Sequence, residues 1–153
     1  MTKPLIIGIG NRFRGDDAVG LIIADKLRGK IDADVIEHDG DATSLIDALN
    51  NRNNVLIIDA IFSNKKVGEI LKYDLNKTTL PDIFAKTSSH AMGVSEAIEL
   101  ARMISILPKE TIFYGIEGKN FEIEQEMSEE VLASVDELLK IIVIDIMAEV
   151  DDA

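Results

Sequence analysis

Short apolar runs alternate with longer stretches of helical period along this chain. Apolar, β-branched runs predict strands at residues 5–9, 35–38, 55–58, 68–73 and 111–116, the fourth of them an edge strand because polar side chains interrupt it. Apolar positions at helical spacing predict helices at residues 18–27, 44–49 and 91–106 and a long final helix capped by Ser128. This alternation predicts an α/β fold in which a mostly parallel sheet carries helices on both faces. We expect a long loop at residues 76–89, with a short turn at 82–85.

Length and composition narrow the class of protein. The chain has 153 residues, which predicts a single domain over residues 1–153. Its formal net charge of −12 argues against nucleic acid as a partner, since phosphate backbones are bound by Lys and Arg patches. There is no cysteine, which excludes thiolate zinc sites, thiol proteases and iron–sulfur centres carried by this chain alone.

The two ends of the chain give no sign of a membrane or secretory segment. The first residues run straight into the first strand without a charged leader and an apolar core. The most apolar long stretch, residues 131–150, is interrupted by charged side chains that a bilayer would exclude. We therefore expect a cytoplasmic protein with no membrane insertion. The wide apolar arc of the final helix predicts either deep core packing or a surface for homo-oligomer formation.

A glycine-rich loop with two acids joins the first strand to the first helix. Its glycines are spaced as GxGxxxxG, and Asp16 and Asp17 stand where a bound phosphate would sit, so a nucleotide-binding domain is the least favoured interpretation. One of the two aspartates would suffice to cap the helix. The other would then lie at the carboxyl edge of the sheet, which is the usual ligand crevice of open α/β folds.

Two more strands end in an aspartate, and a histidine stands before the third helix. Asp39 follows the second strand and Asp59 the third, while His90 lies in Ser-Ser-His-Ala-Met-Gly. Taken singly, each is an ordinary turn, cap or structural residue. Because parallel strands end side by side, Asp17, Asp59 and His90 could together form an oxygen and nitrogen ligand set for Ni, Zn, Fe or Cu, with open positions that suit catalysis or metal sensing. No GxSxG elbow supports serine hydrolase chemistry.

Taken together, these motifs resemble the nickel–iron hydrogenase maturation endopeptidases. The resemblance rests on Gly-Ile-Gly-Asn with its following acid pair, the Asp-Gly turn at 39–40, Ile-Asp-Ala at 58–60, Ser-x-His-x-x-Gly at 88–93 in slightly altered form, and the amphipathic final helix. It covers nearly the whole chain. It implies a three-layer sandwich, in which a twisted sheet of about five strands lies between helices.

The resemblance also implies an activity and roles for residues. Members of this family remove a C-terminal extension from the hydrogenase large subunit after nickel has been inserted. By motif position, Asp17, Asp59 and His90 would bind metal, and Asp39 would take part in activity without being a firm ligand. The nickel would belong to the large-subunit precursor, which is the expected partner. The alternative from another class is a non-catalytic metal-binding or chaperone module that uses the same three ligands.

Overall fold

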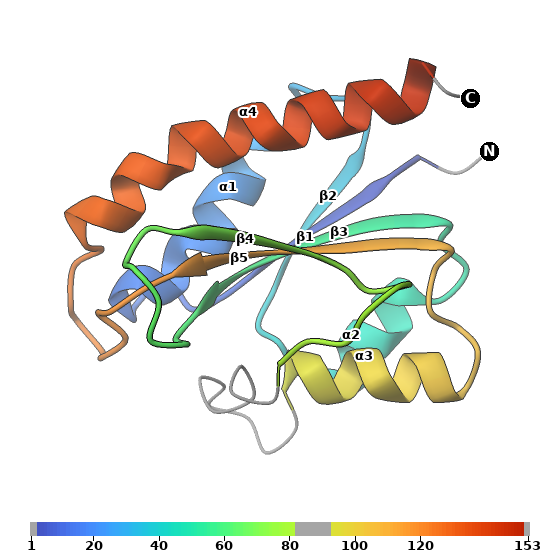
Figure 1. Ribbon diagram of the computed structural model, residues 1–153, viewed down its shortest axis with the longest axis horizontal. Helices are drawn as coiled ribbons and strands as arrows, with labels where there is room; N and C mark the ends of the chain where they lie inside the picture. The colour runs from blue at the N-terminus through green and yellow to red at the C-terminus, as the bar shows by residue number, and fades with distance from the viewer. Residues whose placement is uncertain (1–2, 82–92, 152–153) are drawn as a thin grey trace.

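One five-stranded sheet lies between two layers of helices (Figure 1). The computed structural model describes residues 3–81 and 93–151. The strands are β1 (Leu5–Ile9), β2 (Asp34–His38), β3 (Asn54–Ile61), β4 (Ile70–Asp74) and β5 (Glu110–Glu117). The helices are the short 3-10 helix η1 (Gly15–Ala18) and the α-helices α1 (Val19–Leu27), α2 (Ala42–Leu49), α3 (Val94–Met103) and α4 (Glu129–Asp151).

The strands are arranged in the order β2-β1-β3-β5-β4. All neighbours are parallel except β4, which runs antiparallel to β5. The α/β class and the mostly parallel sheet are therefore confirmed, and so is the position of the fourth strand at an edge. The most apolar run along the chain, in β3, is the central strand, with β1 on one side and β5 on the other. Burial on both faces explains why that run shows no polar alternation.

Each face of the sheet has its own hydrophobic core. Alternate residues of β3 point to opposite faces, so Ile57 packs with α2 and α3, whereas Ile58 packs with α1 and α4. Figure 1 shows these two helix pairs on opposite sides of the strands. In α4 the inward stripe consists of Val131, Val135, Leu138, Ile142 and Ile146.

A backbone contact between helix α1 and the sheet fixes the helix over β1 and β3. A Cβ atom on Gly20 would collide with the carbonyl oxygens of Ile9 and Ile58, and one on Gly8 would collide with the carbonyl oxygen of Gly20. The two glycines therefore let helix and strands approach backbone to backbone. This contact holds the start of α1 over the carboxyl ends of two strands.

Two helix starts differ from the sequence-based expectation. Helix α2 starts at Ala42, two residues early, because the Asp41 carboxylate accepts a hydrogen bond from the Ser44 amide at 3.0 Å. Helix α3 starts at Val94 and ends at Met103, with Gly93 as its N-cap. The expectation that residue 89 or 90 caps this helix is wrong, because the Glu96 carboxylate reaches back to the Gly93 amide at 2.9 Å. The expected turn at 82–85 lies outside the described residues.

The final helix carries apolar side chains on its outer face as well as in the core. Leu132, Ile144 and Met147 are exposed there. Its role as an oligomer surface stays a prediction. Among the described helices, none combines the length and the apolar character needed to span a bilayer.

We predict that Gly20→Ala destabilises the protein by about 2 kcal/mol, because the added methyl group must displace two strand carbonyls. In an uncrowded helix the same change would stabilise by up to about 1 kcal/mol, so the sign of the effect is diagnostic. Urea denaturation measures the difference. Gly29→Asn is the control, since Gly29 has positive φ and open space around it. A stabilised Gly20→Ala variant would contradict the proposed close contact.

Candidate active site

The carboxyl ends of β1, β2 and β3 lie next to one another at one end of the sheet (Figure 1). The register pairs Ile9 of β1 with His38 of β2, and Gly8 of β1 with Ile58 of β3. The segments carrying Asp17 and Asp39 leave the sheet at this end. Asp59 itself lies within β3 and pairs with Gly115, so the expectation that the third strand ends before Asp59 is wrong. The strand continues to Ile61 because it stays paired with β5 beyond the last residues that it pairs with on β1.

Asp17 is held over the end of β1 by the tight path of the chain after that strand. The Asn11 amide donates to the Asp17 carbonyl oxygen at 3.3 Å, and the Asp17 amide donates to the Arg14 carbonyl oxygen at 3.0 Å. A Cβ atom on Gly10 would collide with the Asp17 carbonyl oxygen, so only glycine lets η1 pack so closely against the strand. Asp17 is only partly buried, unlike its neighbour Asp16.

Asp59 and Asp17 form a pair of mutually unfavourable carboxylates. Burial raises the pKa of Asp59 well above its ordinary value, and the negative charge of Asp17 raises it further. Burial also raises the pKa of the Asp17 carboxyl, while the nearby Arg14 guanidinium and a hydrogen bond from the Asn11 amide partly offset this. The ionised forms of both carboxyls are therefore disfavoured. Such a pair near the carboxyl edge of the sheet is a candidate site for binding a cation or for proton transfer.

Asp16 has a different role from its neighbour, although both follow the same glycine loop. Its side chain is fully buried and accepts hydrogen bonds from the amides of Lys119 at 2.8 Å, Asn120 at 3.0 Å and Ser128 at 2.7 Å. The Ser128 hydroxyl donates to it as well, at 3.0 Å. Asp16 thus caps no helix of its own loop. It ties the loop after β5 and the start of α4 to the loop after β1.

Asp39 lies in a turn that a histidine stabilises. Its Oδ1 accepts from the Asp41 amide at 2.9 Å, and its side chain is exposed. The His38 Nδ1 atom accepts from the Gly40 amide at 2.9 Å, which leaves Nε2 as the protonated nitrogen facing Ser44 Oγ at 3.2 Å. Sequence reasoning assigned His38 only to a strand. Its adjacency to the Asp-Gly turn was the signal that could have identified it.

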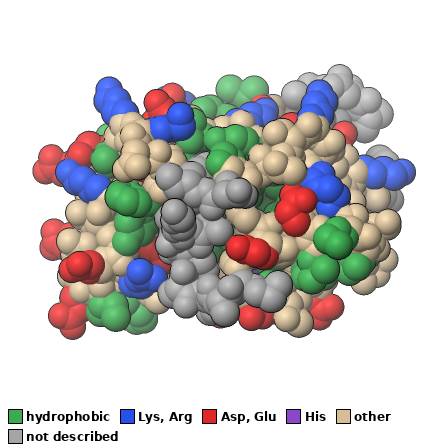
Figure 2. All heavy atoms as spheres, turned by 60° about the horizontal axis from the view of Figure 1, so that its bottom comes forward, with side chains coloured by type: hydrophobic (Ala, Val, Ile, Leu, Met, Phe, Trp, Pro, Cys, Tyr) green, Lys and Arg blue, Asp and Glu red, His purple; other side chains and the backbone are tan. Residues whose placement is uncertain are grey.

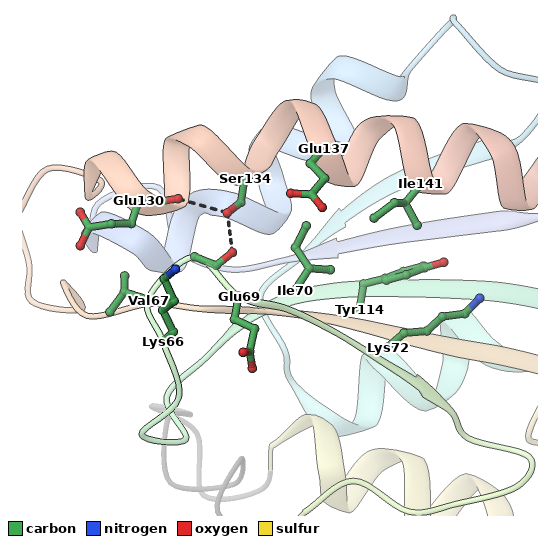
Figure 3. Close-up of a pocket in the computed structure, with 11 residues that line it drawn as sticks. Lys66, Val67, Glu69, Ile70, Lys72, Tyr114, Glu130, Ser134, Glu137 and Ile141 are labelled. Carbon is green, nitrogen blue, oxygen red and sulfur yellow. Dashed lines mark hydrogen bonds between the residues drawn. The ribbon is translucent and has the colours of Figure 1, made fainter.

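Two hollows of the described surface are lined by residues other than Asp17 and Asp59. A shallow hollow of about 450 Å³ is lined by Gly10, Leu21, Glu37, His38, Asp39 and Ser44. A larger hollow of about 680 Å³ lies between β4 and α4 (Figure 3). There the Ser134 hydroxyl donates to the carbonyl oxygens of Gly68 at 2.5 Å and Glu130 at 3.1 Å, and lysine and glutamate side chains surround the opening. The larger hollow contains neither Asp17 nor Asp59.

His90, the third expected ligand, lies outside the described residues. Within residues 3–81 and 93–147, no group of three acidic or histidine side chains is close enough to hold a metal ion. What the structure brings together is the carboxylate pair, and the ligand role of all three residues stays a prediction.

A second buried acid at this end of the sheet was missed by sequence reasoning. Glu117, the last residue of β5, is buried and accepts from the Ser63 amide at 2.8 Å and the Ser63 hydroxyl at 2.5 Å. It therefore holds the chain where it leaves β3. Since Glu117 comes directly after an apolar run in the sequence, just as Asp59 does, the same sequence signal applied to it.

Comparison with known proteins identifies the family of the chain. The family model described as hydrogenase maturation protease (HycI) matches residues 23–145. The chain belongs to the hydrogenase maturation protease family. Its members are peptidases, so this protein is a peptidase hydrolase that acts in hydrogenase maturation. The matched range includes Asp39, Asp59 and His90 and begins after Asp17.

Individual relatives agree with this assignment. The hydrogenase 2 maturation protease of Escherichia coli strain K12 is 28% identical over 125 residues, which cover 78% of this chain and 76% of the relative. The [NiFe] hydrogenase maturation protease HybD of Thermococcus kodakarensis has a similar structure with a TM-score of 0.67 at 29% identity, over 92% of this chain and 96% of that one. An endopeptidase from Escherichia coli matches with a TM-score of 0.81 at 22% identity, over 97% and 93% of the two chains, and this likeness supports the fold alone.

We predict that Asp16→Asn lowers the free energy of unfolding by about 2–4 kcal/mol. The side-chain amide of the new asparagine keeps one acceptor oxygen. Its NH2 group would face backbone N–H groups that need an acceptor. Chemical denaturation followed by circular dichroism measures the loss. Asp17→Asn is the matched control and should not share it. Equal stability of Asp16→Asn and wild type would refute the anchoring role.

We predict that Asp59→Asn stabilises the folded protein by about 1 kcal/mol or more at neutral pH. The folded-state pKa of Asp59 is raised above 3.8, so the ionised carboxylate costs folding free energy. That cost is absent below pH 3.8, grows as the pH rises toward the folded-state pKa, and is fully present above it. The advantage of Asp59→Asn should therefore shrink on acidification. Urea titrations over a pH series check this, with exposed Asp25→Asn as a control expected to change little.

Proposed function

We propose that this protein is an endopeptidase that removes the C-terminal extension of a nickel-loaded [NiFe] hydrogenase large-subunit precursor. The observation that carries the proposal is the electrostatic pairing of Asp17, in η1 after β1, with Asp59, near the carboxyl end of β3, in a chain of the hydrogenase maturation protease family. The name of the Escherichia coli relative, hydrogenase 2 maturation protease, agrees with a hydrogenase as the client. A cytoplasmic location remains our expectation from the sequence.

The electrostatics of the pair support recognition of a cation carried by the substrate. Both carboxyls have raised pKa values because burial, and for Asp59 also the charge of Asp17, disfavours their ionised forms. A divalent ion would relieve both effects at once, since it compensates the burial of charge and the repulsion between the two groups. With the His90 imidazole as a third ligand, the donor set would suit nickel. The nickel is then part of the substrate, and its presence marks a precursor that is ready to be cut.

Amide hydrolysis also needs a water molecule and a group that takes its proton. We propose that the metal-binding carboxylates lie beside the scissile amide and that Asp39, exposed at the end of β2, positions this water or accepts its proton. The turn that holds Asp39 is braced by the Gly40 amide bond to His38. One oxygen of the Asp39 carboxylate accepts a hydrogen bond from the Asp41 amide. The carboxylate lies at the surface, where a substrate can approach.

We predict that Asp17→Asn, Asp59→Asn and His90→Ala fold normally and leave the nickel-loaded precursor uncut. Each change removes one proposed contact to the substrate's nickel. Mass spectrometry of the precursor after incubation measures the loss of the C-terminal peptide. Wild type should cut the nickel-loaded precursor and not the nickel-free one.

The control is Asp25→Asn on the exposed side of α1, which should process at the wild-type rate. Processing by His90→Ala at the wild-type rate would show that the proposed ligand role is wrong. An unchanged precursor mass together with formation of a stable complex would favour the metal-binding or chaperone alternative.

A further inference from the structure

The loops that follow β1, β3 and β5 expose a cluster of apolar side chains. Phe13 is 74% exposed, Ile123 is 72% exposed and Phe62 is 48% exposed. The ring of Phe62 packs edge to face on that of Phe121, with centroids 6.0 Å apart. The Glu124 amide donates to the Phe13 carbonyl oxygen at 2.8 Å, which ties the backbone next to Ile123 to that of Phe13. We call Phe13, Phe62, Phe121 and Ile123 the aromatic patch.

The aromatic patch is connected to the acid pair. Phe13 precedes Asp17 by four residues, and Phe62 follows Asp59 by three. Arg14 links the two features directly, since its Nε donates to the Phe121 carbonyl oxygen at 2.9 Å while its charge acts on the Asp17 carboxylate. The patch and the proposed reaction centre therefore belong to the same end of the sheet.

The loops that carry the patch are ordered by their own hydrogen bonds. The Asn11 side chain accepts from the Phe13 amide at 2.9 Å, and the Asp16 amide donates to the Asn120 carbonyl oxygen at 2.7 Å. The buried Asp16 carboxylate holds the same loop from inside. Because the aromatic side chains are presented on a fixed backbone, binding through them costs little conformational entropy. Exposed aromatic groups of this kind are typical centres of binding energy in interfaces.

Glutamate side chains flank the part of the patch formed by Phe121 and Ile123, whereas Arg12, paired with Glu37, and Arg14 flank Phe13. Glu122, Glu124 and Glu126 are exposed in the loop that carries Phe121 and Ile123. At the left of Figure 2, the end of the molecule where β1, β3 and β5 terminate in Figure 1, hydrophobic side chains lie among acidic and basic ones. A partner that fits this surface presents an apolar segment flanked by Lys or Arg.

We propose that the aromatic patch with its acidic rim is the docking surface for the precursor protein and contacts an apolar, basic-flanked segment near the bond to be cut. This inference rests on the proposed function, because it takes the precursor as the substrate. A second copy of the chain fits less well, since a twofold contact would set the glutamate rims against each other. An anionic lipid surface would be repelled by the same rim.

The test separates docking from chemistry. Phe13→Ser and Ile123→Ser should each raise KM for the nickel-loaded precursor roughly tenfold and leave kcat unchanged, since neither side chain belongs to the acid pair. The double change Glu122→Lys and Glu124→Lys should raise KM severalfold at low salt and have a smaller effect at high salt. Circular dichroism checks that each variant is folded.

Met103→Ser and Ile144→Ser are the matched controls, because these side chains are 79% and 66% exposed on α3 and α4, away from the patch. They should keep the wild-type KM. An unchanged KM for the patch variants, or an equal rise in the controls, would overturn the proposal. So would a wild-type dimer that Phe13→Ser dissociates while KM stays the same.

If wild type cuts no precursor, the proposed function fails, and docking is then judged separately. The same variants are compared for their Kd with the uncut, nickel-loaded precursor. A roughly tenfold weaker Kd confined to the patch variants supports the docking surface without proteolysis. An equal Kd for all variants rejects it.

Discussion

The buried carboxylate of Asp16 is the interaction on which this end of the molecule depends. It accepts from amides that lie 103 to 112 positions away in the sequence, and the Ser128 amide among them is buried, so it depends on this acceptor. One of the donors is Ser128, whose hydroxyl also accepts from the Val131 amide at the start of α4, so the negative charge sits at the favourable end of a long helix. The loop after β1, the loop after β5 and the last helix therefore form a single hydrogen-bonded unit. Asp17, one residue later, instead acts through its charge on Asp59.

The two neighbouring aspartates have opposite electrostatic roles. Asp16 is surrounded by donors that satisfy its charge, whereas Asp17 and Asp59 are placed where burial and mutual repulsion raise their pKa values. Backbone contact at Gly20 holds the start of α1 against the carbonyl oxygens of Ile9 and Ile58, the latter directly before Asp59 in the chain. Selection for stability alone would favour an amide or a hydrogen-bond donor in place of one of these carboxylates. The pair lowers the stability of the fold, and functional sites commonly retain such unfavourable residues.

Sequence reasoning could find the strands because β1, β3 and β5 are apolar on both faces. It could single out Asp59 because this residue directly follows an apolar run, although β3 continues to Ile61 through its pairing with β5. It could not separate Asp16 from Asp17, since both follow the same glycines and the partners of Asp16 lie at the far end of the chain. It placed the start of α3 too early because the cap is supplied by Glu96 from within the helix. The part played by His38 was signalled only by its place before the Asp-Gly turn, because its hydrogen bond depends on the backbone direction at Gly40.

The arrangement of the site suggests how the protease could select a single peptide bond in a single substrate protein. A pair of carboxylates alone would attract many divalent ions, and an aromatic patch alone would attract many apolar segments. If the proposed function is correct, one substrate molecule binds both the carboxylate pair and the aromatic patch. Once one of these contacts has formed, the other forms within the same complex. Because Arg14 and Asp16 fix the patch and the acid pair relative to each other, a substrate gains from both only if its nickel and its apolar segment have the matching separation. Selectivity then arises from the distance that the fold imposes between two individually weak sites, and Asp16 sets that distance.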